Sequence, residues 1–225
     1  KLILAGGLAS SPKLGSDGSI FNVLLAHNYQ NKGIYPGLSP LYTLEKTKEL
    51  DGTRVKSNVR LFIENKLISE ESGEVLFKDH GLSGIVIFNM MSRIARTSKK
   101  ECKLFLDLIP DYSEKEINEY LKEHSLNELL LAFVNPKISE YLKNRFSNEK
   151  DILQSLKNLE FTFDKSYGFD FSQVSVGGID VSEVNEDLMS KKERNVYIIG
   201  ELLDVDGPCG GYNLTFAFAS GQKVK

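Results

Sequence analysis

The chain has 225 residues, 41% of them hydrophobic and 26% charged, which is ordinary for a globular protein with a buried core. Its formal net charge is −3, with acidic and basic residues interspersed, which argues against nucleic acid or an anionic membrane as a partner. No apolar run approaches the roughly 18 residues of a membrane helix, and the cysteines and histidines lack the spacing of a disulfide framework or a metal site. We therefore expect a cytoplasmic protein without a metal site.

The first part of the chain is predicted to be an α/β piece. The apolar run Leu2–Ala5 ends in Gly6 and Gly7, which is typical of a buried strand that leads into a tight turn. Apolar residues then recur at helical spacing over Ile20–His27, with Ser19 as the expected N-cap.

The middle of the chain changes to the period-two alternation of antiparallel strands. Alternating apolar residues over residues 55–77 predict a small barrel or meander with a turn at Ser72-Gly73. Helical spacing returns over Leu82–Ala95, and Lys103–Leu108 is expected to be a further strand. The Lys/Arg-rich stretch 93–103 between them is interpreted as a solvated helix end and loop.

Residues 113–158 have the pattern of consecutive helices. Ser113 and Glu116 have the spacing of a capping box, in which each side chain satisfies a backbone N–H of the first turn. Three amphipathic segments follow, at Leu126–Val134, Ile138–Phe146 and Asp151–Leu159. We predict a compact helical subdomain with short loops.

The last part of the chain returns to α/β patterns. A short buried strand is expected at Val196–Ile199 and a helix from Gly211 onward. The order of elements predicts a mixed α/β (α+β) fold in three parts. These are a discontinuous α/β domain at residues 1–35 and 172–225, a β-rich insert at 36–111 and 159–171, and a helical subdomain at 112–158.

The densest chemical signal is the acidic, glycine-rich segment 200–213. It follows a buried strand, so Glu201 and Asp204 are expected at the carboxyl edge of a sheet, where carboxylates can accept hydrogen bonds from polyol hydroxyls. Gly210 and Gly211 let the backbone approach a flat ligand, and the next helix directs free N–H groups at it. An acidic turn before an ordinary glycine-capped helix would explain the same residues.

This segment resembles the C-terminal flavin-binding signature of the HI0933-like flavoproteins, also called the BaiN/YhiN-like or aminoacetone oxidase family. Their pattern runs roughly Gly-Glu-x-x-Asp-x-x-Gly-x-x-Gly-Gly-Tyr-Asn-x-x-x-Ala. The residues that meet it are Gly200, Glu201, Asp204, Gly207, Gly210, Gly211, Tyr212, Asn213 and Ala217. Further matches occur in the family's order at Ala5–Gly7, Pro12–Gly18, Phe77–Gly84, Asp107–Pro110, Val174–Ile179 and Met189–Lys191.

The resemblance implies the C-terminal part of a two-part, Rossmann-like FAD-binding fold, interrupted by a β-barrel-like insert that carries a small helical subdomain. The discontinuous domain at 1–35 and 172–225 would then be a partial FAD-binding domain. The expected cofactor-binding residues are Gly6, Gly7, Gly200, Glu201, Asp204, Gly210, Gly211, Tyr212 and Asn213.

Each of these residues has an assigned role and an alternative. Asp204 would contact the ribityl chain of FAD, or serve as a turn carboxylate. Glu201 would contact the same chain, or orient the turn. The backbone of Gly210, Gly211 and Tyr212 would face the isoalloxazine edge, and Asn213 would add a contact or cap the helix.

Other reactive residues do not assemble into a catalytic set. Cys209 has no second cysteine nearby in the sequence for dithiol chemistry, and His80 could move a proton on the substrate side or be structural. Arg93 and Arg96 follow a helix and could stabilise its C-terminus. Gly177-Gly178 is expected in a turn packed beside the cofactor. The catalytic residues stay unassigned.

The sequence departs from the family pattern in one important respect. No G-x-G-x-x-G turn, which binds the pyrophosphate in such proteins, occurs in it. We therefore expect a fragment with half an FAD site, inactive by itself. Its parent would be an FAD-dependent oxidoreductase of a small-molecule substrate, with NAD(P)H or oxygen as co-substrate. The alternative is a non-catalytic β/helical binding or interaction module with a structural Gly-rich terminus.

The 225-residue chain is predicted to hold no FAD after purification, whereas a version extended upstream to its natural start should bind it. The reason is the missing phosphate-binding turn. The measurement is the visible absorption spectrum of the two desalted proteins. Stoichiometric flavin in the shorter protein would contradict this prediction, and flavin in neither would favour the interaction module.

Overall fold

The computed structural model describes residues 1–97 and 101–224. Residues 98–100, which fall in the stretch expected to be a solvated helix end and loop, lie outside the described residues, as does residue 225. The chain forms two compact units. Unit 1 consists of residues 1–40, 88–98 and 166–225, and unit 2 of residues 41–87 and 99–165. The three-part division expected from the sequence stays a prediction.

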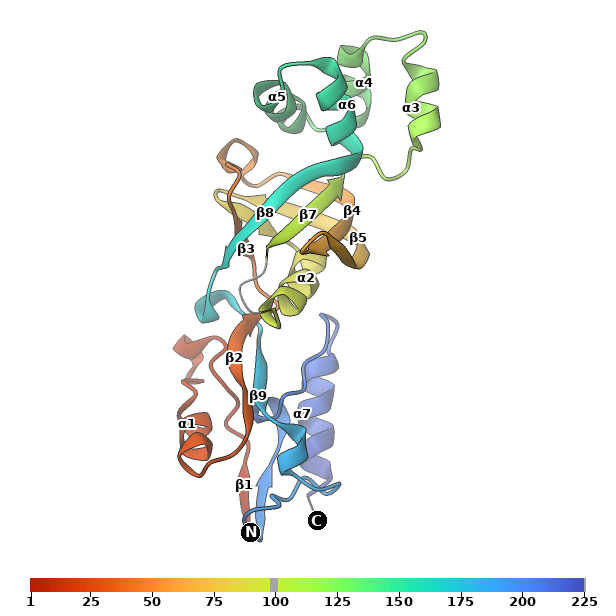
Figure 1. The fold of residues 1–225 in the computed structure, drawn as a ribbon. Helices are drawn as coiled ribbons and strands as arrows, with labels where there is room; N and C mark the ends of the chain where they lie inside the picture. Colours follow the sequence, from red (N-terminus) through yellow and green to blue (C-terminus); the bar gives the residue numbers. More distant parts are fainter. Residues whose placement is uncertain (98–100, 225) are drawn as a thin grey trace. The chain divides into compact units, whose positions relative to one another are not determined.

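Unit 1 contains two small sheets. Strand β1 (Leu2–Leu4) runs parallel to β10 (Val196–Ile198), and β2 (Asn31–Gly37) runs antiparallel to β9 (Val174–Ile179). Helices α1 (Ser19–Ala26) and α7 (Tyr212–Gln222) lie on the two sides of these strands in Figure 1. The core of the unit comprises Leu8, Phe21, Leu24, Tyr29, Ile179, Val184, Ile198, Leu202 and Leu203.

The start of α1 differs from the prediction. Gly18, not Ser19, is the N-cap residue, with a φ of 74° that favours glycine, and the helix begins at Ser19. The carboxylate of Asp17 accepts a hydrogen bond from the Ser19 N–H at 2.9 Å, and this bond holds the pKa of Asp17 below its usual range. A local turn therefore shifts the start of the helix by one residue.

Unit 2 is built on a closed barrel in the order β3-β6-β5-β4-β7-β8. The bounds of its strands are β3 (Leu41–Thr43), β4 (Arg54–Ile63), β5 (Lys66–Lys78), β6 (Gly81–Ser83), β7 (Cys102–Asp107) and β8 (Leu159–Ser166). The alternation of apolar and polar residues places the apolar side chains inside the barrel, where Val59, Leu61 and Leu104 are fully buried. The predicted mixed α/β fold with a barrel is confirmed.

The hairpin turn of the barrel does not lie at Ser72-Gly73. It lies at Glu64 and Asn65, whose φ values of 48° and 63° are typical of a two-residue hairpin, and β5 runs on through residue 73. Gly73 is needed for packing instead of turning, because a Cβ there would approach Val86 Cγ2 to 2.6 Å.

The predicted helix over Leu82–Ala95 also starts later. Residues 81–83 form β6, and α2 (Ile85–Ala95) begins after Gly84, whose φ is 106°. From Phe88 onward, α2 belongs to unit 1.

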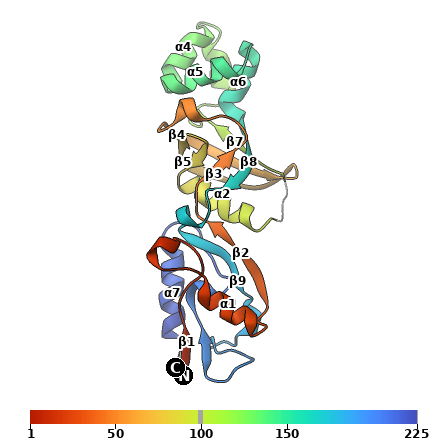
Figure 2. The ribbon, with the colours of Figure 1, turned by 90° about the vertical axis from the view of Figure 1, so that its left-hand side faces the viewer.

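Four short helices complete unit 2: α3 (Glu114–Tyr120), α4 (Leu126–Phe133), α5 (Pro136–Arg145) and α6 (Glu149–Asn158). Both views place α4, α5 and α6 together at one end of the barrel (Figures 1 and 2). The capping box of Ser113 and Glu116 is confirmed, and Ser125 and Glu128 form a second one that the sequence analysis missed. Among the described residues, every helix is too short or too polar to cross a membrane.

The Asp107–Pro110 motif joins the barrel to the helices. Asp107 Oδ1 accepts a hydrogen bond from the Ile109 N–H at 3.0 Å, and Asp107 Oδ2 lies 2.6 Å from Lys157 Nζ on α6. Lys157 also donates to the carbonyl oxygens of Ile109 and Tyr112, at 3.2 and 2.7 Å. The Asp107 and Lys157 side chains are only 14% and 16% exposed. Their ion pair therefore fixes the point where β7 leaves the barrel.

Replacing Lys157 by Met should lower the free energy of unfolding by about 3–5 kcal/mol, because it leaves the Asp107 carboxylate buried without its cation. The measurement is urea unfolding followed by circular dichroism. The matched control is Lys122→Met, which removes an exposed ion pair with Glu119 and should cost about 0.5 kcal/mol or less. Equal losses of free energy of unfolding in the two variants would show that the Asp107–Lys157 pair stabilises the protein no more than an exposed ion pair does.

Candidate functional site

The two segments predicted to bind a ligand leave the same edge of a sheet. Because β1 and β10 are parallel, Gly6 and Gly7 after β1 and Gly200 and Glu201 after β10 emerge at the same end. Gly7 lies so close to Glu201 that a Cβ on it would be 3.2 Å from Oε2 of the carboxylate. Gly6 packs against α1 instead, where a Cβ would collide with Ile20.

Glu201 binds three residues from two parts of the chain. Its carboxylate accepts hydrogen bonds from the Leu8 N–H at 3.5 Å, the Ser10 hydroxyl at 3.0 Å and the Ser175 N–H at 2.5 Å. Ser175 lies on β9, whereas Leu8 and Ser10 follow β1. In this structure Glu201 therefore orients the turn and joins the two sheets of unit 1. Its predicted contact with a ligand stays a prediction.

Asp204 and Asp206 share one cation. Arg96 Nη1 donates to Asp204 Oδ1 at 2.9 Å, and Arg96 Nη2 donates to Asp206 Oδ1. The Asp204 and Asp206 side chains are 15% and 10% exposed, whereas Arg96 is 44% exposed. Arg96 follows α2, as expected from the sequence, and its side chain pairs with these aspartates. Its stabilisation of the helix end stays a prediction.

The surroundings shift the pKa values of this cluster. Burial raises the pKa of Asp206 above its usual range, although Arg96 opposes that shift and Asp204 adds to it. Burial also disfavours the charge on Arg96, but the two aspartates outweigh it and raise the pKa of the guanidinium. The cluster thus has two carboxyl groups for one bridging cation.

The start of α7 is open. Gly210 and Gly211 have φ values of 127° and 91°, and Gly211 occupies the N-cap position, where among the described residues no side chain caps the helix. Gly200 donates its N–H to Ser220 Oγ on α7 at 2.9 Å, which positions the helix behind the turn. Tyr212 is 61% exposed. The first backbone N–H groups of α7 thus remain available to an electron-rich ligand.

Asn213 does not cap α7, and its predicted contact with the cofactor stays a prediction. Its Oδ1 accepts from the Gly207 N–H and its Nδ2 donates to the Gly207 carbonyl, both at 2.9 Å. This double hydrogen bond fixes the loop between the aspartates and the helix.

Helix α2 contributes polar residues that the sequence analysis missed. Asn89 Oδ1 accepts from the Cys209 N–H at 2.9 Å, and Ser92 Oγ accepts from the Leu38 N–H at 3.0 Å. Asn89 and Ser92 lie on one side of α2, and Arg96, the first residue after the helix, continues the spacing i, i+3 and i+7. This regular spacing of polar residues within an otherwise apolar helix was the signal by which the sequence could have shown that they belong to the site. A pocket of about 230 Å³ is lined by Asn89, Ser92, Arg93, Arg96, Asp206, Gly207 and Pro208.

Among the remaining candidates, Gly178 lies against the site segment, because a Cβ on it would be 2.8 Å from the Leu202 carbonyl oxygen and 3.2 Å from the Asp204 nitrogen. Gly177 and Gly178 lie within β9 and not in a turn, and a Cβ on Gly177 would be 2.2 Å from the Gly33 carbonyl oxygen. They allow close strand packing. Cys209 Sγ lies 3.9 Å from Gln173 Oε1, and Cys102 belongs to unit 2.

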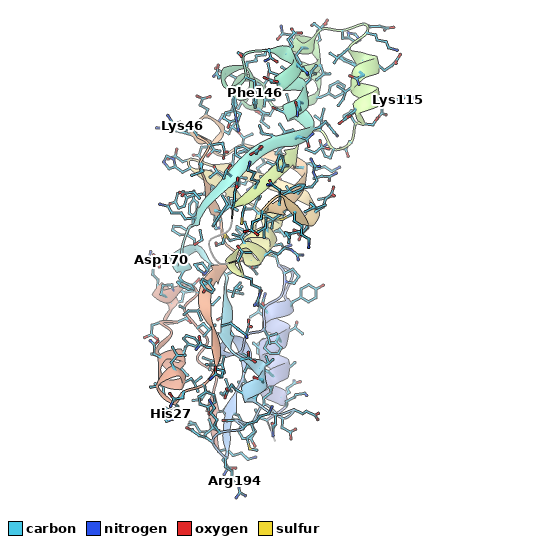
Figure 3. The ribbon with its side chains drawn as sticks, in the orientation of Figure 1. His27, Lys46, Lys115, Phe146, Asp170 and Arg194 are labelled. Atoms are coloured by element: carbon cyan, nitrogen blue, oxygen red, sulfur yellow. The ribbon has the colours of Figure 1, made fainter. Side chains whose placement is uncertain are left out.

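The three histidines are all exposed. His27 follows α1 (Figure 3) and its Nδ1 lies 2.7 Å from Glu193 Oε1. His80 lies between β5 and β6 in unit 2, with Nε2 3.2 Å from Asp79 Oδ2, and His124 stacks on Tyr120. Within residues 1–97 and 101–224, no group of three or more acidic, histidine or cysteine residues could hold a metal ion.

The residues present fit the ribityl and isoalloxazine part of FAD. Carboxylates that outnumber their bridging cation suit hydroxyl donors better than phosphate groups. The uncapped start of α7 suits the electron-rich edge of a flavin ring. A Cβ on Gly211 would meet no atom within 4 Å, so the backbone there is open to a flat ligand.

Comparison with known proteins gives concordant results. A family model described as "HI0933-like protein Rossmann domain" matches residues 1–224 of the chain. A 3-dehydro-bile acid delta(4,6)-reductase from Clostridium scindens is 29% identical over 98% of this chain and 60% of its own length. Ribosomal RNA dihydrouridine synthases from Haemophilus influenzae and Escherichia coli are 27% and 26% identical, over 97% and 98% of this chain. The chain spans 58% of the length of each synthase.

Replacing Glu201 by Gln should lower the free energy of unfolding by about 1–3 kcal/mol, because an amide cannot accept as many hydrogen bonds and leaves donors unsatisfied. Urea unfolding followed by circular dichroism measures the loss. Glu186→Gln, at an exposed position in unit 1, is the control and should stay within about 0.5 kcal/mol of the unchanged protein. A Glu201→Gln protein as stable as the control would refute the joining role.

Proposed function

This chain belongs to the HI0933-like family, and on that premise we propose that the protein is an FAD-dependent oxidoreductase that adds hydrogen to an unsaturated small molecule. The observation that carries the proposal is the segment 200–213, which combines two largely buried carboxylates near its beginning with an open, uncapped helix start at its end. These two features match the hydroxyl-bearing chain and the ring edge of a flavin.

FAD, when bound, supplies the redox chemistry at its isoalloxazine ring. The chain would contribute position and electrostatics. The N–H groups and the dipole at the start of α7 favour negative charge in front of them, as develops on a reduced flavin ring. Asp204 would accept hydrogen bonds from ribityl hydroxyls. Glu201 and Asn213 would keep the segment in place through their contacts with the chain.

The reaction class is suggested by the names of the relatives. A delta(4,6) substrate carries carbon–carbon double bonds, and a dihydro product carries two hydrogens more than its parent. Both names therefore describe the addition of hydrogen to an unsaturated molecule, and we propose the same class for this protein. Adding hydrogen to the substrate consumes two electrons, so NAD(P)H is the proposed reductant of the flavin, whereas oxygen could only take electrons from the reduced flavin. The acid that protonates the substrate is unassigned.

RNA is the second candidate substrate, because two relatives are named for it. The net charge of −3 weighs against it, since proteins that bind RNA need cations to neutralise its phosphates. A small molecule is therefore the preferred substrate class. The rival to an enzyme is still the interaction module with a structural Gly-rich terminus.

Assays should use the protein expressed from its complete coding sequence. Oxidised-flavin absorption after desalting, and its loss when NADH or NADPH is added without oxygen, would support the proposal. A 3-oxo-delta(4,6) steroid and unmodified ribosomal RNA should then be offered as oxidants. Reoxidation by the steroid alone supports the small-molecule class, and reoxidation by RNA alone contradicts it. A protein that neither carries nor takes up flavin would contradict the whole proposal.

Replacing Gly211 by Ala should weaken FAD binding about tenfold, or about 1.4 kcal/mol, because a methyl group then occupies the open backbone that faces the ring. The measurement is the Kd of FAD for the apoprotein. Gly52→Ala is the matched control. Gly52 also has a positive φ, 77°, and no neighbour within 4 Å of an added Cβ, but it lies in unit 2. Equal Kd values in the two variants would contradict the assignment.

A further inference from the structure

We propose that Arg96 is the positioning residue of the flavin-binding segment. Its guanidinium binds one carboxylate oxygen of Asp204 and compensates the negative charge of Asp206. The other oxygen of Asp204 is thereby left in position to accept a hydrogen bond from a ribityl hydroxyl. The inference rests on the proposed function, because it names how the chain prepares that site before the cofactor arrives.

The geometry of the guanidinium is the first support. Arg96 uses Nη1 for Asp204 and Nη2 for Asp206, so one planar group fixes the separation of two carboxylates. Only Oδ1 of Asp204 takes part, and within the described residues no hydrogen bond is made to its Oδ2. A carboxylate with one oxygen fixed and the other unused is oriented to accept one more hydrogen bond.

Burial is the second support. The Asp206 side chain is 10% exposed and the Asp204 side chain 15%. Two carboxylates this close and this buried repel each other unless a cation lies between them. Without Arg96, Asp204 would turn away from Asp206, and its hydroxyl-accepting oxygen would lose its position.

Helix α2 provides the third support, because it fixes Arg96 itself. Asn89 binds the backbone of Cys209, at the far end of the same loop, and Ser92 binds the backbone of Leu38 next to β2. These two contacts anchor the helix in the turns that precede Arg96. The backbone from which the Arg96 side chain extends to the aspartates is therefore held in place.

The experiment measures the Kd of FAD and the urea stability of the apoprotein, expressed from the complete coding sequence. The variants are Arg96→Gln, Arg96→Lys, Asp206→Asn and the double variant Arg96→Gln/Asp206→Asn. Lys32→Gln is the matched control, because it removes a cation that pairs with an aspartate, Asp180, elsewhere in unit 1.

Arg96→Gln should raise the Kd of FAD about tenfold, a change of about 1.4 kcal/mol, and Lys32→Gln should leave it unchanged. Arg96→Lys should fall between the unchanged protein and Arg96→Gln, because an ammonium group restores the charge but not the two-armed geometry. The double variant should bind FAD more tightly than Arg96→Gln, because removing the second carboxylate removes the repulsion. A merely structural role predicts that the Kd of FAD changes only as far as the urea stability of the apoprotein does, whereas a positioning role changes the Kd in a variant whose stability is retained.

The outcomes separate this inference from the proposed function. If the unchanged protein binds no flavin, the proposed function fails and the positioning role falls with it. If the unchanged protein binds flavin and Arg96→Gln binds it equally well, only the positioning role is overturned. A double variant weaker than Arg96→Gln would also overturn it. Should Arg96→Gln fail to fold, Arg96→Lys alone decides, since unchanged affinity there refutes the need for a two-armed cation.

Discussion

The carboxylate of Glu201 is the contact on which unit 1 depends. Each of the two sheets in this unit has only two strands, and such sheets are marginally stable without support. Glu201 accepts hydrogen bonds from Ser175 on β9 and from Leu8 and Ser10 after β1. A single side chain at the end of β10 therefore joins both sheets. It also fixes where the segment 200–213 begins, so the geometry of the candidate site depends on it.

The segment beyond Glu201 has an acceptor end and a donor end at a fixed separation. Asp204 is bound by Arg96 at one end, and the open N–H groups of α7 lie at the other. Between them, the two hydrogen bonds that Asn213 and Gly207 exchange leave the loop little freedom. Preorganisation of this kind reduces the entropy that a bound ligand would otherwise have to overcome. A flavin, with hydroxyls on its chain and an electron-rich ring edge, has the complementary groups in the same order.

Unit 2 is stabilised differently, because its barrel is closed and presents no long strand edge to solvent. The helical part joins it through the largely buried pair of Asp107 and Lys157, which explains why an acidic residue stands in that motif. The family model covers residues of both units, whereas the segment proposed to bind the flavin lies in unit 1.

The sequence by itself determined the features that depend on near neighbours. The alternation in β4, the capping box of Ser113 and Glu116, and the glycine start of α7 all follow from residues a few positions apart, and the structure confirms them. Local patterns also misled, since Ser72-Gly73 has the composition of a turn but Gly73 serves a close contact with Val86. The tertiary structure alone decided the partners of Glu201 and Arg96. Those partners lie between 26 and 193 residues away in the chain, and a hydrogen bond or ion pair over such a separation exists only after the strands and helices have packed.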